Sequence, residues 1–179
     1  MGRGAIIRPG ARLNRERGGR IEIGARSVIH PGAMLLSYGG LIRIGEHCSV
    51  NPYCVLYGHG GLIIGNHVRI AAHCVIIPAN HSIALDGGLI SRQPETRRGI
   101  RIGNDVWLGA GVRVLDGADI ADGCVVAAGA IVRGSLAANA IYAGVPAKLV
   151  RMRKSAKEEA KDLANVVSLA DRSATVAAP

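Results

Sequence analysis

Histidine is the side chain of this sequence best suited to move protons at neutral pH, because its unperturbed pKa lies nearest to neutrality. A histidine beside a hydroxyl or an amine can act as general base when a group is transferred to that acceptor. Six histidines are present, namely His30, His47, His59, His67, His73 and His81. The elements that hold each histidine decide which of them is free for such a role.

The sequence repeats every six residues over most of its length. An Ile, Leu or Val fills the first place of each hexad, and a small or modest residue fills the fifth. The first-place residues are Ile23, Ile29, Leu35, Ile44, Val50, Leu56, Ile64, Ile70, Ile76, Ile102, Leu108, Val114, Ile120, Val126 and Val132. Repetition at a fixed short period is the signature of a solenoid.

Each hexad predicts one short strand followed by a turn, and three hexads would close one triangular coil. First- and fifth-place side chains then point inward and stack on their equivalents one coil away. Successive coils pair as parallel strands about 4.8 Å apart. A thin interior of this kind needs no large aromatics, and the chain has 25 Gly, one Trp and no Phe. The 179 residues therefore predict a single all-β domain built as a parallel β-helix.

The four cysteines all fall at the fifth place of a hexad. They are Cys48, Cys54, Cys74 and Cys124, and no two are spaced as in a zinc knuckle or a disulfide framework. We expect them to be small buried hydrophobic residues. This disfavours an acyl-cysteine intermediate.

Three interruptions break the hexad register. Extra residues appear around 38–40 and 58–61, and a long break runs from about 79 to 99. Function in a solenoid usually lies where the repeat breaks, and a loop this long inside a compact domain favours a functional role. His81 lies at the start of the long loop, where repeat packing does not require a histidine. It is therefore the candidate general base, and a loop-bracing histidine is the alternative.

The net charge of +9 suits anionic small ligands such as phosphates. Nucleic-acid binding is disfavoured, because the arginines are scattered and aromatic stacking partners are few. No apolar run approaches the roughly 18 residues that span a membrane, and the N-terminal residues do not resemble a signal peptide. We expect a cytoplasmic protein with reduced thiols and no membrane insertion.

The hexads Ile102–Trp107 and Ile44–Ser49, the segment Val106–Gly109 and the closing segment Ala143–Arg151 resemble the hexapeptide-repeat acyltransferases. The resemblance covers roughly residues 20–153 and is strongest to galactoside and maltose O-acetyltransferases and bacterial polysaccharide O-acetyltransferases. It implies a left-handed parallel β-helix, with residues 1–153 as the acyltransferase domain. It also implies a homotrimer with sites between subunits, acetyl-CoA as co-substrate and a sugar as acceptor.

The same resemblance implies roles for individual residues. His81 matches the general base, Asn51 matches a residue on the acceptor side, and Trp107 matches a residue near the thioester. The pantetheine arm would lie along Gly109, Ala110 and Ala128, and the nucleotide end would meet Lys148 and Arg151. Two places depart from the family pattern. His59 stands where an acidic residue meets the acceptor sugar, and Gly134 replaces a basic residue, with Arg133 beside it.

Several alternatives remain open. A His base serves O-acetylation of a sugar or N-acetylation of an amino sugar. A further alternative is a non-catalytic β-helix scaffold that kept the fold and lost the chemistry. A zinc enzyme of the γ-carbonic anhydrase type is disfavoured, because His67 and His73 are six residues apart and should point from different faces of the prism. We therefore expect no metal. Residues 154–179 form either a C-terminal helix or a flexible tail.

Overall fold

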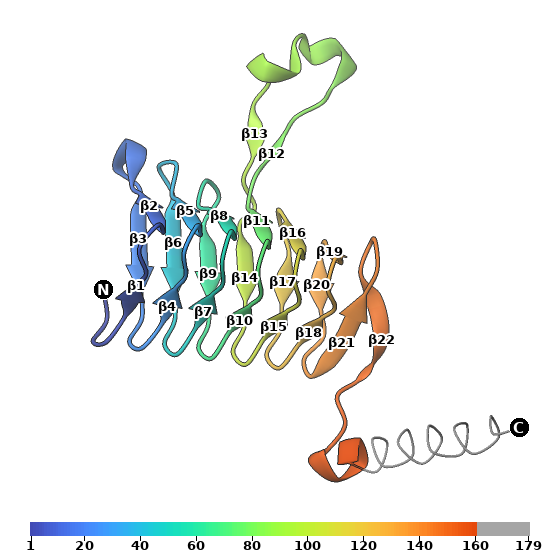
Figure 1. The fold of residues 1–179 in the computed structure, drawn as a ribbon. Coiled ribbons are helices and arrows are strands. Elements are labelled where there is room, and N and C mark those ends of the chain that lie inside the picture. The colour runs from blue at the N-terminus through green and yellow to red at the C-terminus, as the bar shows by residue number, and fades with distance from the viewer. Residues whose placement is uncertain (161–179) are drawn as a thin grey trace, which may run out of the picture.

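A computed structural model describes residues 1–160. The chain winds into a three-sided prism whose coils stack from the N-terminal to the C-terminal end (Figure 1). Each coil contributes one short strand to each of three parallel sheets, which we name A, B and C in the order in which the chain visits them. This architecture is the expected left-handed parallel β-helix.

Sheet A contains β1 (Ile6–Ile7), β4 (Val28–Ile29), β7 (Ser49–Val50), β10 (Arg69–Ile70), β15 (Trp107–Leu108), β18 (Val125–Val126), β21 (Ala140–Ala143) and β22 (Lys148–Met152). Sheet B contains β2 (Arg12–Asn14), β5 (Met34–Leu36), β8 (Val55–Tyr57), β11 (Val75–Ile77), β16 (Arg113–Leu115) and β19 (Ile131–Val132). Sheet C contains β3 (Arg20–Ile23), β6 (Leu41–Ile44), β9 (Leu62–Ile64), β14 (Ile100–Ile102), β17 (Asp119–Ile120) and β20 (Ser135–Leu136).

The interior of the prism follows the predicted hexad pattern. All fifteen first-place residues are buried, and so are the fifth-place residues. Strand pairing places like positions over one another, as in the register Leu35 to Leu56 and Ile76 to Val114. Burial of these side chains is the main favourable contribution to folding, since apolar area removed from water yields about 25 cal/mol per Å².

The four cysteines are buried and unpaired, as predicted. Each thiol also donates a hydrogen bond to a backbone carbonyl oxygen where the chain turns, for example Cys54 Sγ to Ala71 O at 3.0 Å and Cys124 Sγ to Ala137 O at 2.8 Å. Burial raises the pKa of Cys48 and Cys124, because a thiolate there would be desolvated. The fifth place therefore suits a residue that is small and can also donate a weak hydrogen bond.

The corner between sheets C and A carries a ladder of polar residues. His47, His67 and Asp105 occupy equivalent turn positions with positive φ angles. The rings of His47 and His67 stack with centroids 5.0 Å apart, and Asp105 pairs with Arg153. The three residues share one hexad place in successive coils, and this shared place accounts for the ladder.

The C-terminal end of the prism is covered by an antiparallel pair of strands. β22 turns back along β21, and a helix begins after Ser155. The backbone N–H of Ser155 donates to the Glu158 carboxylate, and the Ser155 hydroxyl oxygen accepts the backbone N–H of Glu158, which is the arrangement of a helix-capping box. The helix runs from 156 to 160, and the remainder of the expected helix or tail, 161–179, lies outside the described residues. None of the helical segments within residues 1–160 is long and apolar enough to cross a membrane.

The long interruption forms an ordered arm that projects from the corner between sheets B and C (Figure 1). Its base is an antiparallel pair, β12 (Asn80–His81) and β13 (Glu95–Thr96), and its tip contains two short 3-10 turns, η2 (Leu85–Gly87) and η3 (Ile90–Arg92). A third turn, η1 (Glu16–Gly18), lies at the same corner in the first coil. The loop predicted for residues 79–99 is thus confirmed, and it is more regular than its sequence indicates.

Two side chains fix the arm. The buried Gln93 accepts a hydrogen bond from the Ala84 N–H and donates to the carbonyl oxygens of Ala84 and Gly88, all at 2.9 Å. At the base of the arm, the Asp116 carboxylate accepts hydrogen bonds from the backbone N–H groups of Arg98 and Gly99, at 2.9 and 3.0 Å. The return strand is therefore tied to the following coil.

We expect all four thiols to be unreactive in the native protein. Ellman's reagent should detect no fast-reacting cysteine before denaturation and four afterwards, because each thiol is buried and out of the reagent's reach. Rapid labelling of any thiol in the native protein would contradict the packing described for the fifth place.

Replacing Gln93 with Ala should loosen the arm and leave the prism intact. The loss of three hydrogen bonds, each worth about 1 kcal/mol, should speed amide exchange in residues 82–92 by about tenfold or more, with little change in exchange within the coils. The matched control is Ser91→Ala, which alters an exposed side chain of the same arm. Equal exchange in both variants would show that Gln93 does not hold the arm.

Candidate active site

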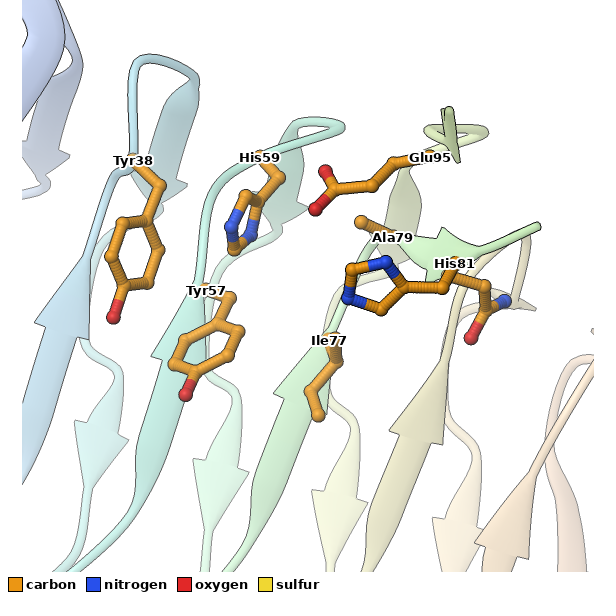
Figure 2. Close-up of a pocket in the computed structure, with 8 residues that line it drawn as sticks. Tyr38, Tyr57, His59, Ile77, Ala79, His81 and Glu95 are labelled. Carbon is orange, nitrogen blue, oxygen red and sulfur yellow. The ribbon is translucent and has the colours of Figure 1, made fainter. Parts of the chain in front are cut away.

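A cavity of about 240 Å³ lies at the corner between sheets B and C, on the N-terminal side of the arm. The three interruptions occur at this same corner in successive coils, so their side chains converge on one place. The cavity is lined by Tyr38, Tyr57, His59, Ile77, Ala79, Asn80, His81 and Glu95 (Figure 2).

An aromatic group forms one side of the cavity. The rings of Tyr38 and His59 stack with centroids 4.5 Å apart, and Tyr57 meets both of them edge-on. Burial raises the pKa of Tyr57, and the neighbouring Tyr38 adds to the effect. The Tyr57 phenol therefore stays protonated at neutral pH and can donate a hydrogen bond.

His59 is held in its neutral form by its surroundings. Burial lowers the pKa of His59, and the Glu95 carboxylate opposes this effect. Its Nδ1 atom is buried and has no hydrogen-bond partner among residues 1–160. Such an unsatisfied buried nitrogen is uncommon in folded proteins.

The arm supplies the opposite side of the cavity. His81 and Glu95 lie directly across from each other in the β12–β13 pair, and Figure 2 shows both side chains on the arm side, facing the aromatic group. The Glu95 carboxylate is paired with Arg97 at 3.1 Å. His81 is exposed to solvent, so its imidazole can exchange protons with water or with a ligand.

Of the predicted site residues, His59 and His81 line this cavity. Asn51 lies at the corner between sheets A and B, where its Nδ2 donates to the carbonyl oxygen of Ile70 at 2.8 Å. This hydrogen bond braces the turn, as expected if Asn51 has a structural role.

The predicted donor-binding residues gather elsewhere. Trp107 lies on the outer face of sheet A with 54% of its surface exposed. Gly109, Ala110 and Ala128 follow at the corner between sheets A and B, and Lys148 and Arg151 lie on β22. A Cβ atom on Gly109 would lie 2.6 Å from the backbone nitrogen of Ala128, so glycine is required there by the close approach of two coils. Within one chain, sheet B separates all these residues from His81.

A second hollow lies on the C-terminal side of the arm. It is lined by Arg98, Arg133 and Gly134, together with Asn80, Leu115, Asp116 and Gly117. Two guanidinium groups and one carboxylate line this hollow. Its net charge is therefore positive, which suits a phosphate-bearing ligand.

The positions of His67 and His73 bear on the alternative of a zinc site. His67 stacks on His47 at one corner of the prism, whereas His73 stacks on Tyr53 at another. They diverge, as their spacing predicts. Within residues 1–160, no group of three or more His, Cys, Asp or Glu side chains is arranged to hold a metal ion.

Tyr38, Tyr57 and Glu95 were not identified from the sequence as site residues. Tyr38 and Tyr57 each lie in or next to an interruption at the same corner, and this shared placement is a signal that the sequence contains. Glu95 has no such signal, because the hairpin pairing that places it opposite His81 is not visible in the sequence.

Comparison with known proteins supports the repeat assignment. Residues 99–134 match the family described as bacterial transferase hexapeptide (six repeats). The chain is 33% identical over 91 residues to a probable acetyltransferase of Mycobacterium tuberculosis, which covers 51% of this chain and 30% of that protein. It is 34% identical over 95 residues to a putative lipopolysaccharide biosynthesis O-acetyl transferase of Escherichia coli, covering 49% of this chain and 48% of the relative. The chain thus spans half or less of the length of these curated relatives.

Among solved structures, the fold is similar to that of the S84A mutant of an N-acyltransferase from Bacillus cereus, in complex with dTDP-4-amino-4,6-dideoxyglucose and coenzyme A. The TM-score is 0.76 at 22% identity, over 90% of this chain and 87% of that one. At this identity the similarity concerns the fold alone. The hexad register and the three-sided prism agree with the match of residues 99–134 to the hexapeptide-repeat transferases.

Proposed function

We propose that this protein is an acyl-CoA-dependent O-acetyltransferase that transfers an acetyl or similar acyl group to a hydroxyl of a sugar or polysaccharide precursor. The observation that carries the proposal is the His81 imidazole, presented by an ordered arm into a cavity with polar and aromatic walls. The names of the relatives, which are acetyltransferases, support the same activity. Buried, unpaired cysteines agree with a cytoplasmic location.

The proposed reaction is a direct transfer in a ternary complex. His81 accepts the proton of the acceptor hydroxyl as its oxygen attacks the thioester carbonyl carbon. A carbon–oxygen bond forms, the carbon–sulfur bond breaks, and the coenzyme A thiolate recovers the proton from the imidazolium. The acceptor would be held by the Tyr57 phenol and by the His59 imidazole. A covalent acyl-cysteine step is disfavoured because all four thiols are buried.

The donor half of the site would come from a second copy of the chain. Trp107, Gly109 and Ala128 lie across sheet B from His81, so one chain does not offer both halves to one substrate pair. We therefore infer a homotrimer, in which the A–B corner of one copy meets the B–C corner of the next. Lys148 and Arg151 would then meet the nucleotide end of the donor.

The outer faces of the sheets support this arrangement. Sheet B presents a largely apolar outer face of half-buried side chains, interrupted by the exposed Arg12 and Arg113. The apolar residues are Met34, Leu36, Val55, Val75, Ile77, Leu115 and Ile131. Sheet C instead carries the exposed ion pairs Glu22–Arg43 and Arg101–Asp119. An apolar face of this size is typical of a subunit interface, whereas ion pairs suit solvent. Sheet B would thus face the three-fold axis.

N-acylation of an amino sugar is the second candidate. The similar structure from Bacillus cereus belongs to an N-acyltransferase bound to an amino sugar nucleotide. An ammonium group would favour a carboxylate, and the cavity contains Glu95. Because Glu95 is already paired with Arg97, the hydroxyl acceptor is the first choice.

His81→Ala should abolish turnover and leave donor binding intact. Loss of the general base should lower kcat by about a hundredfold or more, measured as thiol release from acetyl-CoA. Acetyl-CoA at about 100 times its Kd should still stabilise both proteins by roughly 2.7 kcal/mol in thermal unfolding. His67→Ala is the matched control, since it removes a surface-ladder histidine. Full activity of His81→Ala would refute the assignment of the base, and a wild type that binds no acyl-CoA would favour a non-catalytic scaffold.

Val55→Glu should dissociate the trimer. A carboxylate on the apolar outer face of sheet B would be buried without a partner on assembly, so light scattering should report a monomer with little residual activity. Ile63→Glu is the control, because Ile63 lies on the outer face of sheet C between Arg43 and Arg101. A wild-type monomer, or an unchanged Val55→Glu trimer, would contradict the proposed interface.

A further inference from the structure

A pair of stacked rings stands on the corner between sheets A and B. Tyr53 and His73 stack with centroids 5.4 Å apart and ring planes 12° from parallel. Tyr53 is 61% exposed, and His73 is also exposed. Neither ring contributes to the hydrophobic core.

The pair is held rigidly although it is exposed. Both residues have positive φ angles, 60° and 62°, and their backbone N–H groups donate to Pro31 O and Pro52 O of the preceding coil. The Tyr53 ring lies over Gly32, where a Cβ atom would meet the ring at 2.5 Å. A rigidly held aromatic pair that is open to solvent is typical of a contact surface, since Tyr is enriched at interfaces.

Rotational symmetry predicts what this surface meets. If three prisms pack around an axis parallel to their own, each coil of one copy lies level with the same coil of the next. Tyr53 and His59 belong to one coil, and His73 and His81 belong to the following coil. The A–B corner carrying Tyr53 and His73 therefore faces the B–C corner carrying His59 and His81.

We propose that Tyr53 and His73 of one copy form the outer wall of the acceptor cavity in the next copy and select its acceptor. The flat Tyr53 ring would pack against the apolar face of a hexopyranose, and the His73 imidazole would hydrogen-bond to a ring hydroxyl. This inference rests on the proposed trimeric transferase and deepens it, because it names the acceptor class as a pyranose sugar and adds two residues that select it.

The first test separates an effect on acceptor binding from an effect on donor binding. The probes are methyl glycosides of glucose, galactose and mannose, with thiol release from acetyl-CoA as the readout. Tyr53→Ala with His73→Ala should raise the acceptor KM by about tenfold or more, with kcat less affected and the thermal shift by acetyl-CoA unchanged. Tyr53→Phe should retain most of the affinity. An unchanged acceptor KM would overturn the proposal, and so would a wild type that binds acetyl-CoA but acetylates none of the three glycosides.

The second test asks whether the wall comes from the neighbouring copy. Mixed trimers of His81→Ala with the Tyr53→Ala, His73→Ala double variant can be isolated with two affinity tags. Each mixed trimer contains one site with an intact cavity and an intact facing corner, so about a third of wild-type activity should return at limiting acceptor.

The control mixes His81→Ala with His59→Ala. Both changes lie in the same cavity, so no site is restored and activity should stay at background. Absence of recovery in the first mixture, with normal acetyl-CoA binding, would show that the pair does not act across the interface. Failure of the wild type to bind acetyl-CoA would instead refute the proposed function itself.

Discussion

Stacking of like hexad positions from coil to coil is the interaction on which the rest of the structure depends. First-place aliphatic side chains and small fifth-place residues fill the narrow prism, with Tyr142 stacked on Val126 in the last coil, and strand pairing keeps them in register. Each coil touches only its neighbours, so extra residues are accommodated outward at the corners without disturbing the core. The same regularity gives every corner residue a fixed height along the prism.

That constraint explains why a cavity forms where it does. Insertions at one corner in consecutive coils lie next to one another, so Tyr38, His59 and His81 converge although they are far apart in sequence. The arm adds Glu95 because its two strands pair at the base, and Asp116 ties the return strand to the next coil. The reactive imidazole thus stands on a structured support, which favours preorganisation.

The buried positions and the location of the arm were predictable from the sequence, because both follow from the six-residue period. The fifth-place cysteines were predicted as buried, whereas their hydrogen bonds to turn carbonyls, such as that of Cys54 to Ala71, depend on how coils approach at the corners. Tyr57 lies next to an interruption and could have been identified from that placement, whereas the role of Glu95 was not predictable, since it arises from hairpin pairing. Motif resemblance placed Asn51 and Gly109 in the same site as His81, but it does not indicate which corner each occupies. In three dimensions they belong to a different corner, and the proposed composite site follows from that separation.

A structure of the assembled protein with coenzyme A bound tests the central claim most directly. The account predicts a pantetheine arm that passes between two copies, packed against Gly109, Ala110 and Ala128 of one, with its sulfur directed at His81 of the other. Coenzyme A bound wholly within one copy, or with its sulfur directed away from the cavity that contains His81, would contradict it.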